Sequence, residues 1–170
     1  LDADGRNFVR YFHASGNAAS LAHNWVYALH RGASRQLWIG TVGGGIDRWD
    51  GAGGKFEHFP LAQLVDGARG LDDVFAIHEA ADGRVWAGTR DGLVVLDPAQ
   101  RTAKRVDLAN DTGTQPLITT MHADRYGRLW IATLAHGVLS VDLATGEWTR
   151  AHPGSVGAPG NLPAQPALSL

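Results

Sequence analysis

Residues 35–50 read RQLWIGTVGGGIDRWD, and two later stretches repeat the same pattern. Residues 83–98 read GRVWAGTRDGLVVLDP, and residues 127–142 read GRLWIATLAHGVLSVD. In each stretch a tryptophan lies in an apolar run that ends in threonine. A turn ending in glycine follows, and a second apolar run closes on aspartate. The chain therefore contains three copies of one unit, spaced 44 to 48 residues apart.

Each unit holds four short runs of residues separated by turn residues. The runs are rich in Val, Ile, Trp and Phe and are too short for helices, so they indicate β-strands. Asp82-Gly83 and the stretch ATGE at 144–147 supply tight turns between them. Four antiparallel strands in a repeat of this length are typical of a propeller blade. We predict an all-β fold, a β-propeller segment with whole blades at 20–60, 71–108 and 115–152.

The two ends of the chain extend the pattern beyond the three blades. Residues 5–12 read GRNFVRYF and match the fourth strand of a preceding blade, which we place at 5–13. Residues 166–170 read PALSL and resemble the first strand of a following blade, which we place at 161–170. A propeller needs about four blades to close. We therefore expect a piece of a larger protein that associates with itself through its exposed blade edges.

Composition narrows the classes of function. The chain has 170 residues and a formal net charge of −2, so no strong field favours nucleic acid. It contains no cysteine, which excludes disulfides and thiol catalysis. It has no run of 18 apolar residues that could span a membrane. We expect no nucleic-acid partner, and contact with a membrane only through other parts of a parent chain.

The first unit carries a resemblance to a known family. Residues 21–59 read LAHNWVYALHRGASRQLWIGTVGGGIDRWDGAGGKFEHF, which resembles the two-component regulator propeller repeat. The third unit also matches, with Ala132 in place of the usual glycine. The second departs at Asp72-Asp73, where the pattern has asparagine, and at Ala80, where it has an acid. The resemblance implies a periplasmic sensor region of a bacterial hybrid histidine kinase or diguanylate cyclase, with an unknown or glycan-derived ligand.

The candidate ligand site lies where the chain enters each innermost strand. Ligands of propellers bind at one mouth, built from unlike residues on like loops. Trp25 stands where the other units have Asp73 and Leu117, so the repeat does not require it, and it could stack on a sugar or another planar ligand. Asp72 and Asp73 are neighbours that point opposite ways, unlike the paired carboxylates of a glycosidase. The predicted ligand-binding residues are Asn24, Trp25, Asp72, Asp73 and Gln115.

A histidine recurs at one position in all three units, at His30, His78 and His122. Three imidazoles around a propeller axis would suit zinc or copper if they converged. Equivalent positions on neighbouring blades are commonly too far apart to bind one ion, so we favour hydrogen bonds between blades. The sequence thus predicts no metal site, no cofactor and no catalytic residue.

Three classes of function compete. The first is a non-catalytic, ligand-sensing module of a signalling receptor in the periplasm, whose partner is a small molecule or a glycan-derived ligand. The second is a propeller enzyme, a lyase or a glycan hydrolase, which would need an acid and a base at the mouth. The third is a scaffold for protein–protein contact, which a flat and apolar mouth would favour. Polar recognition groups without an acid–base pair favour the first class.

Overall fold

The computed structural model describes residues 9–33, 35–51, 54–65, 70–109 and 113–150, and within them it forms three four-stranded sheets. Blade 1 contains β1 (Val26–Arg31), β2 (Leu37–Thr41), β3 (Gly45–Trp49) and β4 (Phe56–Phe59). Blade 2 contains β5 (Val74–Glu79), β6 (Val85–Thr89), β7 (Gly92–Asp97) and β8 (Thr102–Val106). Blade 3 contains β9 (Ile118–Ala123), β10 (Arg128–Thr133), β11 (Val138–Asp142) and β12 (Trp148–Arg150). A short helix, α1 (Leu61–Leu64), follows β4.

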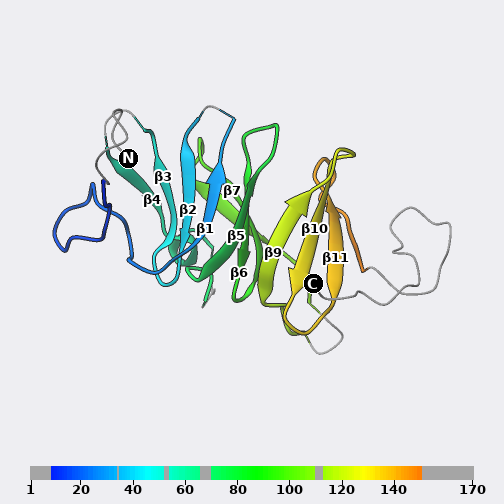
Figure 1. The fold of residues 1–170 in the computed structure, drawn as a ribbon. Helices are drawn as coiled ribbons and strands as arrows, with labels where there is room; N and C mark the ends of the chain where they lie inside the picture. Colours follow the sequence, from blue (N-terminus) through cyan, green and yellow to red (C-terminus); the bar gives the residue numbers. More distant parts are fainter. Residues whose placement is uncertain (1–8, 34, 52–53, 66–69, 110–112, 151–170) are drawn as a thin grey trace.

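Each sheet is antiparallel and keeps its strands in chain order. The first strands of the blades lie next to one another, with β5 between β1 and β9 (Figure 1). The prediction of an all-β propeller segment with three four-stranded blades is confirmed. Residues 9–13 form no strand, although Tyr11 packs against Trp49 and Phe56 of blade 1. The predicted strand at 5–13 is therefore absent from its described part, residues 9–13. Residues 1–8 and 161–170 lie outside the described residues, so the rest of the two orphan strands stays a prediction.

The threonine and glycine of the repeat close one turn in every blade. The hydroxyl of Thr41 donates to the carbonyl of Gly45 at 3.1 Å, and that of Thr89 donates to Gly92 at 2.8 Å. Blade 3 has the same bond at 2.7 Å. Gly45 and Gly92 have φ angles of 75° and 100°, which L side chains rarely adopt. The second-to-third strand turn therefore needs both residues, which explains their recurrence.

The core lies between blades, because each sheet buries one face against the next. Trp38 and Trp86 are fully buried at these two interfaces. Gly40 lets blade 2 approach closely, since a Cβ there would lie 2.8 Å from Cγ1 of Val74. Gly88 does the same for Ile118 of blade 3. Blade 3 has Ala132 at this position, on a face that no described blade covers.

Candidate functional site

Each innermost strand contains a β-bulge near its first residue. In β1 the register with β2 skips from Val26 to Ala28, so Tyr27 has no opposite residue. Phe75 holds the same place in β5, and Thr119 holds it in β9. A bulged residue interrupts the alternation of a strand and re-aims its side chain. The bulges thus set three different side chains at equivalent points of three neighbouring inner strands.

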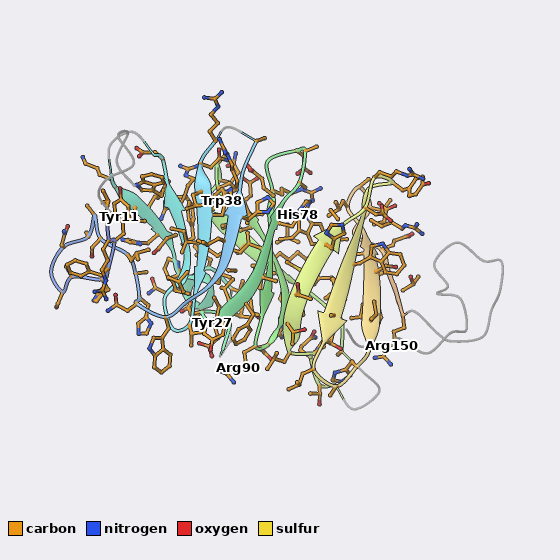
Figure 2. All side chains as sticks on the ribbon, in the orientation of Figure 1. Tyr11, Tyr27, Trp38, His78, Arg90 and Arg150 are labelled. Atoms are coloured by element: carbon orange, nitrogen blue, oxygen red, sulfur yellow. The ribbon has the colours of Figure 1, made fainter. Side chains whose placement is uncertain are left out.

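An aromatic pair bridges the first two blades at these bulges. The rings of Tyr27 and Phe75 lie edge to face, with centroids 5.5 Å apart and planes at 89°. Tyr27 is 66% exposed. The guanidinium of Arg90 lies 5.8 Å from the centre of the Phe75 ring, and its Nε is 2.5 Å from the carboxylate of Asp73. Figure 2 labels Tyr27 and Arg90 at the same, lower end of the blades.

The loops around this aromatic pair are fixed to one another by a repeated backbone bond. The first residue after each second strand donates its N–H to the carbonyl just before the innermost strand of the same blade. The three donor and acceptor pairs are Val42 and Trp25 (2.9 Å), Arg90 and Asp73 (3.1 Å), and Leu134 and Leu117 (3.0 Å). Val42 also forms a β-bridge with Asp73, which links blade 1 to blade 2. The scaffold under the exposed side chains is therefore tightly hydrogen-bonded.

Two of the five predicted residues lie in this region. Trp25 is 65% exposed, and its ring meets the edge of His23 with centroids 5.8 Å apart. Asp73 is held by Arg90 and, through Val42, beside the backbone of Trp25. We call Trp25, Tyr27, Asp73, Phe75 and Arg90 the mouth site.

The other three predicted residues hold connecting segments through hydrogen bonds. Oδ1 of Asn24 accepts the N–H of His13 at 2.8 Å. Oδ1 of Asp72 accepts the N–H of Ala62, at the start of α1, at 3.1 Å. The amide of Gln115 donates to Asp107 at 2.8 Å and accepts the N–H of Leu108 at 3.1 Å. A binding role for these residues stays a prediction.

Sequence reasoning missed Tyr27, Phe75 and Arg90, which make up most of the mouth site. The residues Tyr27, Phe75 and Thr119 hold one position in the three units, and they differ in kind. Trp25 was selected because its position holds different residues in the three units, and the same is true of the position of Tyr27, two residues further along the chain. The bulge that re-aims these side chains is a property of strand pairing, so the sequence did not indicate it.

The repeated histidines lie towards the other end of the inner strands, where Figure 2 labels His78. His30 and His78 meet edge to face, with ring centroids 5.3 Å apart. Nε2 of His30 accepts the N–H of Glu79 at 3.1 Å, the bond between blades that we expected at this position. Burial lowers the pKa of His30, and burial together with His30 and His122 lowers the pKa of His78. Among the residues that the structure describes, no group of three His, Asp or Glu side chains could hold a metal ion.

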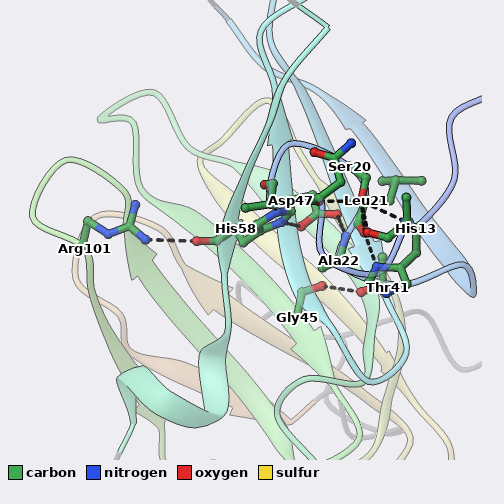
Figure 3. Close-up of polar contacts among 12 residues, drawn as sticks. His13, Ser20, Leu21, Ala22, Thr41, Gly45, Asp47, His58 and Arg101 are labelled. Atoms are coloured by element: carbon green, nitrogen blue, oxygen red, sulfur yellow. Dashed lines mark hydrogen bonds and ion pairs between the residues drawn. The ribbon is translucent and has the colours of Figure 1, made fainter.

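A second polar cluster lies on the front of blade 1, the face opposite to blade 2 (Figure 3). Nδ1 of His58 lies 2.6 Å from the fully buried carboxylate of Asp47, and Nε2 lies 2.8 Å from the carbonyl of Ala18. Asp47 also accepts the N–H of Ala22 at 2.8 Å. Ser20 is nearby, but its hydroxyl bonds to the backbone of residues 14, 17 and 21. The imidazole therefore faces a backbone carbonyl, and the cluster fastens the N-terminal segment without activating a nucleophile.

Comparison with solved structures supports this architecture. The extracellular domain of BT3049 from B. thetaiotaomicron, described as a hybrid two-component system, matches 86% of this chain with a TM-score of 0.71 and 23% identity. That of BT4673, from the same organism, matches 82% with a TM-score of 0.67 and 22% identity. At these identities the likeness establishes the fold. The chain is a β-propeller segment.

The propeller segment spans 19% and 20% of the lengths of those two chains. They are extracellular domains of two-component systems, the class of protein that the sequence resemblance implies. Virginiamycin B lyase from Staphylococcus aureus also matches, over 78% of this chain and 43% of its own, with a TM-score of 0.60 and 14% identity. No protein-family model matches the chain, and no curated protein does so either. Within the described residues, no helix of the segment is long and apolar enough to cross a membrane.

Proposed function

We propose that this propeller segment is a non-catalytic, ligand-sensing module in the periplasmic region of a bacterial signal-transduction receptor. Two independent observations support the proposal. The repeat resembles that of two-component regulators, and the extracellular domains of two such systems share the fold. The segment spans about a fifth of those chains, and in this proposal membrane attachment and signal output belong to other parts of the receptor.

The exposed aromatic group of the mouth site carries the proposal. Trp25 and Tyr27 are about two-thirds exposed, yet they stand on backbone that is fixed by repeated hydrogen bonds. A rigid scaffold that presents aromatic rings to solvent loses little entropy when a ligand binds. The mouth site therefore suits recognition of a ring-shaped ligand.

The chemistry of the mouth site favours a sugar. The flat apolar face of a pyranose can stack on Trp25 or Tyr27, and the ion pair of Asp73 with Arg90 offers both acceptors and donors to its hydroxyls. Asp73 is the only carboxylate in the site as defined, and Arg90 is its partner. A lyase or a hydrolase would need a separate acid and base there, so binding without turnover is the better fit.

Titration with a panel of disaccharides tests the proposal. We would measure binding of neutral and hexuronate-containing disaccharides by isothermal titration calorimetry, and follow the sugar by NMR for turnover. We expect saturable binding by at least one member, recovery of the sugar unchanged, and about a tenfold weaker affinity in Trp25→Ala or Tyr27→Ala. Conversion of the sugar would overturn the non-catalytic assignment.

Tyr126 offers a matched control. Its side chain is 67% exposed, like that of Tyr27, but it lies on the turn between β9 and β10 at the opposite end of its blade. Tyr126→Ala should leave the affinity unchanged. Equal losses in Tyr126→Ala and Tyr27→Ala, or no binding by any disaccharide, would refute the sugar-binding role of the mouth site.

A further inference from the structure

The outer part of the interface between blades 1 and 2 is filled by a charged cluster. Glu57 of β4 forms ion pairs with Arg48 of β3 and, at 2.7 Å, with Arg101 of blade 2. The guanidinium of Arg101 also donates to the carbonyl of His58 at 3.0 Å and covers the ring of Phe59 at 4.9 Å. One carboxylate between two guanidinium groups thus closes this interface.

The backbone of Arg101 adopts an unfavourable conformation at this interface. Its φ is 53°, in the left-handed region that side chains other than glycine and asparagine rarely adopt. The equivalent residues of the other blades are glycines, Gly54 and Gly146, with φ angles of 65° and 77°. At this one position the backbone is therefore left-handed in all three blades, and only blade 2 adds a side chain there. That side chain acts as a plug for the interface with blade 1.

The interface between blades 2 and 3 lacks every part of this cluster. The strand registers set Val95 opposite Lys104 where blade 1 has Arg48 opposite Glu57. Gly146 of blade 3 stands where blade 2 has the Arg101 side chain. The result is a groove of about 660 Å³, whose lining includes Lys104, Val106 and Gly146, the counterparts of Glu57, Phe59 and Arg101. The groove is thus the counterpart, between blades 2 and 3, of the interface that Arg101 fills between blades 1 and 2. Its central residue is the cation Lys104, where the other interface has the anion Glu57.

The charges in the groove favour an anion. Arg84 pairs with Asp82 at 2.6 Å, and its guanidinium also lies 3.5 Å from the carbonyl of Leu143 in blade 3. Arg105, which also lines the groove, pairs with Asp91 at 2.7 Å, so the positive charge that the groove offers comes from Lys104. Lys104 has no ion-pair partner among the described residues, and it is exposed. Two carboxylates also line the groove, but each caps its own turn: Oδ1 of Asp97 accepts two backbone N–H groups, and Oδ1 of Asp107 accepts one and the amide of Gln115.

We infer that the groove between blades 2 and 3 is a second binding site, which takes the anionic group of a small molecule. The carboxylate, sulfate or phosphate of such a ligand would lie near the ammonium group of Lys104. The carboxylate of Glu57 lies in a similar way beside Arg48 and Arg101 at the interface between blades 1 and 2. This site is on the outside of the blades and shares no residue with the mouth site. The two sites can therefore be tested separately.

Titrations with charged and neutral forms of one sugar test the inference. The probes are glucuronate, glucose 6-sulfate and glucose 6-phosphate, with glucose as the neutral control. We expect saturable shifts of the backbone amide signals of residues 104–106 and 145–146 in ¹H–¹⁵N NMR spectra with at least one anion, and none with glucose. Lys104→Glu should weaken the affinity about tenfold or more, because it replaces a charge-assisted contact by repulsion.

Two further variants make the test specific. Lys55→Glu makes the same charge change just before β4 of blade 1, outside the lining of the groove, and should leave the affinity unchanged. The double variant Lys104→Glu with Gly146→Arg rebuilds the ion pair of the plugged interface, so it should abolish binding while the protein stays folded. Equal losses in Lys55→Glu and Lys104→Glu, binding that survives the rebuilt plug, or no saturation with any anion would overturn the inference.

Discussion

Nδ1 of His58 lies 2.6 Å from the buried carboxylate of Asp47, and its Nε2 is hydrogen-bonded to the carbonyl of Ala18 at 2.8 Å. With Asp47 ionised both partners are acceptors, so the ring donates twice and carries a positive charge, although burial raises the pKa of that carboxyl. Blades 2 and 3 have Val94 and Leu139 at the position of Asp47, packed against the preceding blade. The ion pair replaces that apolar contact and fastens the N-terminal segment to blade 1.

Removal of His58 should destabilise the protein more than removal of Asp47. His58→Ala leaves a carboxylate buried without a cation, and we expect it to cost about 2 kcal/mol, discounted because the imidazole is partly exposed. Asp47→Val leaves His58 close to solvent and places at this position the residue that blade 2 has, so it should cost less. Urea unfolding of both variants checks the order, and a larger loss in Asp47→Val would contradict it.

The same pair should make stability depend on pH. Burial alone would lower the pKa of His58, but its bonds to Asp47 and Ala18 outweigh this and raise the pKa above the usual 6.5. A raised pKa contributes stability that is complete below the unfolded value and is lost as pH rises through the folded value. The stability difference between wild type and His58→Gln should therefore be largest at about pH 6 and shrink as pH rises into the alkaline range. A constant difference over this range would show that the ring is not charged.

Asp124 should support blade 3 through its tryptophan. Its Oδ2 accepts the indole N–H of Trp130 at 3.0 Å, whereas Trp86, whose blade has Ala80 at this position, has no such partner among the described residues. Burial would raise the pKa of Asp124, but bonds from Trp130 and the backbone N–H groups of residues 126 and 128 lower it to about 2. Asp124→Ala should lower Tm at pH 7, with the difference from wild type vanishing as pH falls from about 4 to about 2. Equal Tm values at pH 7 would refute this.

Gly88 should be far less tolerant of substitution than its counterpart in blade 3. A Cβ at Gly88 would collide with Ile118, so Gly88→Ala must push blades 2 and 3 apart, at a cost of about 1–3 kcal/mol. Ala132→Gly relieves no contact and should cost only about 0.5–1 kcal/mol through backbone entropy. Chemical unfolding of the two variants measures the contrast. Similar losses would show that the glycine serves only its own strand.

The front of blade 1 should drive self-association. It carries an apolar hollow of about 220 Å³ whose lining includes Val26, Leu29 and Trp49. Leu29 is 65% exposed, whereas Ile77, at the same place in blade 2, is buried against blade 1. We expect a second copy of the chain to cover this hollow, giving a mass that rises with concentration in light scattering. Leu29→Asp should restore the monomer mass, and a concentration-independent monomer mass for wild type would contradict the prediction.

The blades could be predicted from the sequence because each residue type that recurs in the repeat has one structural role. Threonine and glycine close a turn in each blade, and Trp38 and Trp86 fill the space between neighbouring sheets, so these residue types recur at fixed spacing. The site is different. Trp25 and Asp73 could be found as deviations from the repeat, but Asn24, Asp72 and Gln115 deviate for a local reason, since their side chains cap or hold connections.

The remaining features depend on contacts between units, which a single repeat does not encode. The bulge at Tyr27 follows from the pairing of two strands. The plug at Arg101 follows from the approach of one blade to another, and the sequence shows only an arginine in a turn. Asp47 is polar where the other units have apolar residues, because the N-terminal segment takes the place of a preceding blade there.

Most residues of a sheet both pair with a neighbouring strand and present a side chain, whereas the bulged residues of the inner strands only present a side chain. Tyr27, Phe75 and Thr119 have no partner across the sheet, so exchanging one of them removes no residue pair of the strand ladder. It changes instead the contacts at this end of the blades, namely the ring pair of Tyr27 with Phe75 and the bond from Thr119 to the carbonyl of Ala132. Mutation can therefore change the surface at these three points while the pairing of the strands is kept. A chain built in this way can acquire a new specificity through single substitutions, and duplication of a blade would add another such variable position each time.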